Sequence, residues 1–283
     1  MKKLALALLF ASTLVAQPLH AQTIVKQVND RRSNGSFSSL SITMELPNIK
    51  STDVAASRVL VSNAVDDAGG NLLNTEGGEP QLQPNSRGMY SDNPGPLTVD
   101  VDLKNPSRKS TSLKSVSGQI ELFMPSKDSN SVAEIPKFTS FSGKTLSHKA
   151  FKANNVEISL VSEAQLEAER KKLTEAKTKE LKESGYDDET LKSVLSSYTD
   201  YLLKFDEGDV VLRVKDEGKH IQDIAYIDAK GEVKRASIND KDGYTVLSTW
   251  GEKPEADWKL RVNMKTAKNI VRVPFSLTNV PLP

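Results

Sequence analysis

Apolar and polar residues alternate along most of the chain, which is the pattern of strands that bury one face. The alternation predicts strands on both sides of a central segment that has a different period. In the first part of the chain they cover residues 40–46, 57–65, 97–103, 120–124, 132–138 and 156–160. In the last part they cover residues 210–214, 224–226, 233–238, 244–247, 258–264 and 271–277. Pro274 cannot donate a ladder hydrogen bond, so we expect the last strand to lie at a sheet edge.

The central segment has a helical period and predicts a helical hairpin over residues 163–205. Ser162 and Gln165 have the spacing of a capping box, so a first helix is expected to begin there and to run to about Glu183. Gly185 fits the position after a helix end, and Asp187 fits the N-cap of a second helix. The apolar stripe of the first helix is thin and that of the second is broad, so we expect the first helix to be the more exposed one.

These patterns predict a mainly β protein with two immunoglobulin-like β-sandwich domains and an inserted helical hairpin. About 260 residues follow position 21, which is enough for two cores of ordinary size. The expected organisation is a signal peptide over 1–21, a flexible leader over 22–37, an N-terminal β-sandwich domain over 38–162, the hairpin over 163–205 and a C-terminal β-sandwich domain over 206–283.

The amino terminus has the pattern of a bacterial secretory signal peptide. Lys2 and Lys3 precede an apolar run over residues 4–16, and Ala21 follows a short polar stretch as the expected cleavage site. The apolar run is shorter than the roughly 20 residues that a membrane-spanning helix needs. We therefore expect a periplasmic or secreted protein without a membrane span.

Composition narrows the chemistry that the chain can perform. The sequence contains no cysteine, which excludes disulfides, thiolate metal sites and a cysteine nucleophile. Removal of Lys2 and Lys3 would change the formal net charge from +1 to −1, so no strong positive field attracts nucleic acid. We expect no nucleic-acid partner.

The motifs with possible chemistry each have a simpler structural interpretation. Ser142-Gly143-Lys144-Thr145 resembles the end of a phosphate-binding loop but lacks its first glycine. Asn239 to Gly243 resembles part of a calcium loop, although Asp242-Gly243 is also a strong hairpin-turn signal. Asp66 and Asp67 could contribute to a calcium site between loops, which remains an alternative.

Nothing in the sequence indicates an active site. Two histidines follow the signal peptide, His148 and His220, too few for a zinc site without cysteine. A Ser-His-Asp triad has no local motif to support it. A glycosidase needs only two carboxylates, and the chain has many, so the sequence does not exclude that activity. We predict a protein that is not an enzyme and that has no cofactor, no catalytic residues and no metal site.

Candidate partner-binding residues lie in three places. The first is the apolar stripe of the first helix, Leu166, Leu173 and Leu181, which would serve as a binding arm if the hairpin does not simply cover a sandwich. The second is Met89 and Tyr90 in a long glycine- and proline-rich loop, and the third is Trp250 at a strand end. Local packing is the simpler interpretation for Met89, Tyr90 and Trp250, whereas Trp258 is in phase with the apolar face of its strand and is expected in the core.

The ending Val271–Pro283, together with Leu97–Pro125, resembles a loose group of exported bacterial proteins of unknown function with tandem immunoglobulin-like β-sandwich modules. The resemblance covers about half of the chain, carries no catalytic motif, and implies only the fold and the compartment. We expect a non-catalytic binding or adaptor protein of the bacterial envelope that recognises a protein partner through loops, sheet edges or the helical hairpin. The alternative is a carbohydrate-binding module or an accessory domain of a glycan-processing system.

Overall fold

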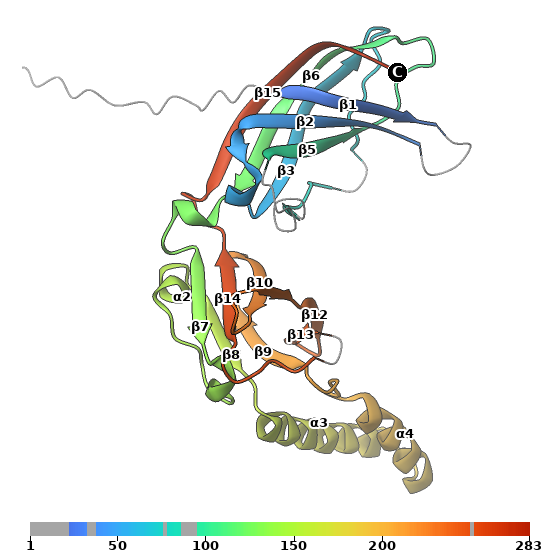
Figure 1. The fold of residues 1–283 in the computed structure, drawn as a ribbon. Coiled ribbons are helices and arrows are strands. Elements are labelled where there is room, and N and C mark those ends of the chain that lie inside the picture. The colour runs from blue at the N-terminus through green and yellow to red at the C-terminus, as the bar shows by residue number, and fades with distance from the viewer. Residues whose placement is uncertain (1–22, 33–37, 76–77, 86–94, 250–251) are drawn as a thin grey trace, which may run out of the picture. The chain divides into compact units, whose positions relative to one another are not determined.

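The computed structural model describes residues 23–32, 38–75, 78–85, 95–249 and 252–283 of the chain (Figure 1). The structure is mainly β, as the alternation predicted: it contains several antiparallel sheets and a smaller share of helix. The chain divides into two compact units, a first unit of Met1–Phe123 with Val271–Pro283 and a second unit of Met124–Ile270. The second unit is therefore an insertion between two strands of the first.

The first unit contains a three-stranded sheet and a four-stranded sheet that face each other (Figure 1). The first sheet has the order β1 (Ile24–Arg31), β2 (Ser39–Lys50) and β5 (Pro96–Leu103). The second sheet has the order β15 (Ile270–Pro281), β6 (Ser112–Phe123), β3 (Ala56–Asp66) and β4 (Gln83–Pro84), and a 3-10 turn, η1 (Ser51–Asp53), follows β2. The strand that contains Pro274 lies at a sheet edge, which confirms the prediction made from that proline.

Alternation in β2 and β5 builds the core of the first unit. Leu40 pairs with Leu103 and Ile42 pairs with Val101, and all four side chains are buried. Met44 and Leu46 continue the same buried row. Because successive side chains of a strand point to opposite faces, the polar residues between these positions lie on the other face of the sheet.

The second unit contains two four-stranded sheets around one core. The first has the order β11 (Val233–Arg235), β10 (Ile221–Ile227), β14 (Lys259–Met264) and β7 (Val132–Pro136). The second has the order β12 (Ser237–Lys241), β13 (Tyr244–Ser248), β9 (Val210–Lys215) and β8 (Glu157–Leu160). The short elements η2 (Pro125–Lys127), η3 (Phe138–Phe141) and α2 (Lys149–Ala153) complete the unit, and Trp258 is buried in its core as expected.

This division differs from the domain boundaries that the sequence suggested. Strands β7 and β8 lie before the helices and were placed in the N-terminal domain, but they pair with β14 and β9 of the second unit. The last strand, β15, belongs to the first unit. Residues 24–31, predicted as part of a flexible leader over 22–37, form β1 and pair with β2, so that prediction was wrong. Alternation identifies a strand but not its partner, and here the partners are far apart in the sequence.

The helical hairpin consists of α3 (Glu163–Glu183) and α4 (Asp188–Tyr201) and belongs to the second unit. Both reciprocal hydrogen bonds of the predicted capping box are present, and Asp187 accepts a hydrogen bond from the Thr190 N–H as the N-cap of α4. The expectation that the first helix is the more exposed one was wrong. Leu166 and Leu181 of α3 are buried, whereas no described side chain of α4 is.

One buried hydroxyl in the second core has no partner. Tyr226 stacks on Phe138 at 5.4 Å and lies 6.0 Å from Trp258, measured between ring centroids. Its side chain is fully buried, and its oxygen forms no hydrogen bond within the described part of the chain. Burial, together with the negative charge of Asp209, raises the pKa of this hydroxyl, which therefore stays neutral.

We expect Tyr226→Phe to increase the free energy of unfolding by about 1 kcal/mol, because the desolvation cost of an unpaired hydroxyl is removed while the ring remains. Chemical denaturation followed by circular dichroism measures the change. Tyr244→Phe is the matched control, since the Tyr244 hydroxyl accepts a hydrogen bond from Arg213 at 3.1 Å and its removal should cost about 1 kcal/mol. Destabilisation by Tyr226→Phe would instead indicate a buried water bound to this hydroxyl.

Candidate binding site at the helical hairpin

The amino-terminal half of α3 packs on the outer face of the β9 and β13 pair. Leu166, Leu203, Val211 and Tyr244 form a small buried cluster, separate from the main core of the second unit. Four half-buried apolar residues surround it, namely Val161, Leu173, Leu202 and Phe205. The hairpin is therefore anchored to the sheet at the start of α3 and at the chain segment that follows α4.

Two cations hold the segment after α4 in place. Arg170 of α3 donates hydrogen bonds to the carbonyl oxygens of Leu202 and Leu203, at 3.2 and 2.9 Å. These carbonyls lie at the carboxyl end of α4, where a positive charge is favourable. Lys241 donates to the carbonyl oxygen of Lys204 and lies 5.3 Å from the centre of a neighbouring aromatic ring, that of Phe205.

A pocket of about 440 Å³ lies between α3, the segment after α4 and the β12–β13 turn. This volume is within the range of small-molecule sites, about 300 to 1,000 Å³. Leu173, Leu202, Leu203 and Tyr244 provide its apolar walls. The walls include backbone fixed by Arg170, so the pocket is formed before any ligand arrives.

Three charged side chains line the same pocket, Arg213 of β9, Glu169 of α3 and Asp242 of the β12–β13 turn. The guanidinium carbon of Arg213 lies 5.4 Å from the centre of the Tyr244 ring. Its Nη2 donates to the hydroxyl of that tyrosine at 3.1 Å. These contacts orient the guanidinium plane.

The turn that carries Asp242 has the geometry that its sequence predicted. Asp242 and Gly243 both have positive φ, 54° and 81°, between the paired residues Lys241 and Tyr244. Two consecutive positive φ values define the two-residue hairpin turn for which Asp-Gly is the preferred sequence. The hairpin-turn interpretation of this segment is therefore confirmed, and the turn fixes the Asp242 carboxylate at the pocket.

The residues predicted to bind a partner are placed differently from expectation. Leu166 and Leu181 are buried in the chain's own structure, and Leu173 is half-buried in the pocket wall. The α3 stripe is therefore not an exposed surface. Met89, Tyr90 and Trp250 lie outside the described residues. The sequence contains no signal for Arg213 and Glu169 beyond a polar residue in a regular element, and it indicated Asp242 only as part of a turn or a calcium-loop motif.

Apolar side chains on α4 are partly accessible. Leu191, Val194, Leu195 and Tyr198 recur at helical spacing, and all four are only half-buried. Two tyrosines flank this face, and they are 48% exposed at Tyr186 and 78% exposed at Tyr201. Tyrosine offers a large apolar ring with a polar end, a combination enriched at protein interfaces.

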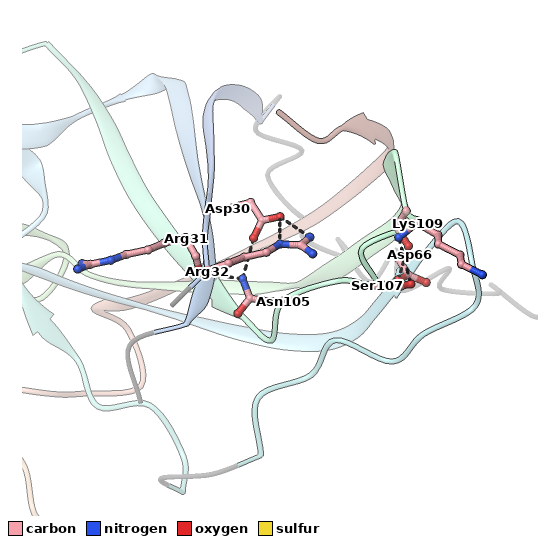
Figure 2. A network of polar contacts seen from close by, with 8 residues as sticks. Asp30, Arg31, Arg32, Asp66, Asn105, Ser107 and Lys109 are labelled. Atoms are coloured by element: carbon pink, nitrogen blue, oxygen red, sulfur yellow. Dashed lines mark hydrogen bonds and ion pairs between the residues drawn. The ribbon is translucent and has the colours of Figure 1, made fainter. Parts of the chain in front are cut away.

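A second polar region lies in the first unit (Figure 2). Asp30 accepts hydrogen bonds from Arg32 and from Asn105, at 2.8 and 2.7 Å, which ties the β5–β6 loop to the end of β1. The side chains of Arg31 and Lys109 point away from each other in Figure 2. These cations do not converge on a common point, so the region does not form an anion site.

Asp66 and Asp67, considered as calcium ligands, hold the β5–β6 loop instead. Asp66 is buried and accepts hydrogen bonds from Ser107 N–H and Ser110 Oγ, at 3.1 and 2.7 Å. Asp67 accepts from the backbone and hydroxyl of Thr111, at 3.0 and 2.8 Å, and these bonds lower its pKa to about 2. Within the described residues, no group of three or more His, Asp or Glu side chains could hold a metal ion.

His148 and His220, the two histidines among the described residues, also have structural contacts. His148 is the N-cap of α2, where its Nδ1 accepts a hydrogen bond from the Ala150 N–H at 3.2 Å. His220 Nδ1 lies 3.3 Å from a carboxylate oxygen of Asp216.

Comparisons of the chain with protein-family models, with curated proteins and with solved structures found no match. No helix within the described ranges has both the length and the apolar character needed to cross a membrane.

Proposed function

We propose that this chain is a non-catalytic binding or adaptor protein, exported to the bacterial envelope, that recognises a protein partner through the helical hairpin. The observation that carries the proposal is the half-buried apolar face of α4, with the exposed Tyr186 and Tyr201 at its two ends. Exposed tyrosines beside half-buried aliphatic residues favour a protein interface. Export is inferred from the amino-terminal pattern, which lies outside the described residues.

We also propose that the first unit is an immunoglobulin-like sandwich. If its strands are lettered in chain order, β1, β2 and β5 correspond to A, B and E, and β15, β6, β3 and β4 correspond to G, F, C and C′. Immunoglobulin domains place A, B and E in one sheet and C, F and G in the other. An experimental structure that pairs β15 with a strand other than β6 would contradict this assignment.

The connectivity supports a recognition role. The second unit replaces the connection between the strands that correspond to F and G. In variable immunoglobulin domains that connection is one of the antigen-binding loops, so this insertion point suits recognition, by analogy of fold. In the second unit the first strand, β7, shares a sheet with the last, β14, and not with the next strand, β8. Immunoglobulin domains keep the first two strands, A and B, in one sheet, so the immunoglobulin assignment concerns the first unit alone.

The carbohydrate-binding alternative receives less support. A glycan site needs aromatic rings that share one platform, and the exposed aromatic residues of the described chain are Phe141, Tyr186 and Tyr201. Tyr186 and Tyr201 are separated by the length of α4, about 22 Å at 1.5 Å per residue, so they cannot stack on one sugar ring.

A crosslinking pull-down from the native envelope tests the proposed function. We expect the mature chain to capture a defined protein and Tyr186→Ser/Tyr201→Ser to reduce that capture about tenfold or more, because buried tyrosines often dominate interface energy. Ile238→Ser is the matched control, since Ile238 is also exposed in the second unit but lies on β12. Equal capture by all three proteins would contradict a role for the hairpin.

A further inference from the structure

The pocket beside α3 contains charged side chains that form no close ion pair within the described part of the chain. Among the described residues, Arg213 forms no ion pair within 4 Å, and neither Glu169 nor Asp242 does. All three line one pocket of about 440 Å³. Stacking on Tyr244 holds the guanidinium, and the remaining N–H groups of an arginine in this position can bind a carboxylate with two hydrogen bonds.

The combination of one cation and two carboxylates selects the charge of a ligand. A simple anion would be attracted by Arg213 but repelled by Glu169 and Asp242, and a simple cation would be repelled by Arg213. A ligand that carries a carboxylate and an ammonium group at different positions satisfies all three side chains. The apolar walls, Leu173, Leu202 and Tyr244, require an apolar group on the same ligand.

We propose that this pocket binds the carboxyl-terminal end of a protein chain whose last residue is apolar and whose preceding residue is basic. The terminal carboxylate pairs with Arg213, the apolar side chain lies against Leu173 and Leu202, and the basic side chain lies beside Glu169 and Asp242. Capture of a chain terminus is a recurrent mode of peptide recognition. The inference rests on the proposed function, because it specifies the chemistry of the partner at the hairpin.

Nuclear magnetic resonance titration of the isotope-labelled mature protein tests this site, with the peptide acetyl-Ala-Lys-Leu as the probe. We expect saturable shifts at residues 202–203 and 242–244, and about tenfold or more weaker binding of the carboxyl-terminal amide of the same peptide. Arg213→Gln should weaken binding of the peptide with a free carboxyl terminus by a similar factor. Lys215→Gln removes one positive charge from the same face of β9 but does not line the pocket, so it should leave the affinity unchanged.

Equal binding of acid and amide, no effect of Arg213→Gln, or no saturable binding would each overturn the proposal. Free leucine, whose ammonium and carboxylate groups are attached to the same carbon, is tested separately. If leucine binds and the peptide does not, the assignment to a chain terminus is overturned. The pull-down reports on Tyr186 and Tyr201 and not on the pocket. Partner capture that depends on Tyr186 and Tyr201, combined with no peptide binding, would reject this inference alone.

Discussion

Gly118→Ala is expected to decrease the free energy of unfolding by about 3 kcal/mol or more, because the new methyl group would overlap backbone. An alanine Cβ at this position would lie 2.2 Å from the Leu60 carbonyl oxygen and 2.9 Å from the Val61 Cα. It would also lie 3.0 Å from the Phe275 ring. Since β6 lies between β3 and β15, movement away from one neighbour is movement toward the other.

Denaturant unfolding followed by circular dichroism measures this effect. Gly95→Ala is the matched control in the same unit, because, chain neighbours aside, no atom of the described residues lies within 4 Å of the position of its Cβ. We expect that control to change the free energy of unfolding by less than about 0.5 kcal/mol. A similar small change for Gly118→Ala would mean that β6 and β3 are not as close as the structure places them.

Glu121→Ala is expected to destabilise the protein by about 3 kcal/mol, because two guanidinium groups would lose a shared buried carboxylate. The Glu121 side chain is 6% exposed, and its carboxylate forms ion pairs with Arg58 at 2.7 Å and with Arg272 at 2.9 Å. The two arginines come from the strands on either side of β6. Burial opposes the ionisation of Glu121, but the hydrogen bonds from Arg272 and Arg58 outweigh it and lower its pKa.

The lowered pKa fixes the pH dependence of this effect. A carboxyl group with a lower pKa in the folded state stabilises the protein above its unfolded pKa, which is ordinarily 4.5, and this contribution is lost as the pH falls. The difference between the wild type and Glu121→Ala should therefore decrease below about pH 4.5. Thermal unfolding across this pH range measures it, and a constant difference would show that the carboxylate charge contributes little.

Glu134→Ala provides the matched control for a more exposed pair. Glu134 of β7 is 37% exposed and contacts Arg261 at 2.7 Å on the neighbouring strand. Solvent screens this interaction, so its removal should cost less than about 1 kcal/mol. Equal losses for Glu121→Ala and Glu134→Ala would contradict the importance of burial for the Glu121 cluster.

Local chemistry explains the predictions that the structure confirmed. The capping box at Ser162, the positive-φ turn at Asp242-Gly243 and the edge position of the Pro274 strand each depend on a few neighbouring residues. Alternation in β2 places Leu40 and Ile42 in the core for the same reason, because side-chain direction follows directly from strand geometry.

The candidate site could not be predicted, because its parts come from separate elements. Leu173 belongs to α3, Arg213 to β9 and Asp242 to a turn, and only packing of the hairpin on the sheet brings them together. The same packing buries Leu166, which the helical pattern alone placed on an available stripe. A helical period identifies an apolar face but does not identify what covers it.

The sequence by itself determined most of the strands, the two capped helices and the turn between β12 and β13, because these depend on interactions over a few residues. Tertiary structure decided which strands share a sheet and where the chain divides. The pairing of Glu134 in β7 with Arg261 in β14 depends on register and burial between distant segments. Many pairings satisfy the same alternation, and only the mutual packing of the two sheets selects one of them.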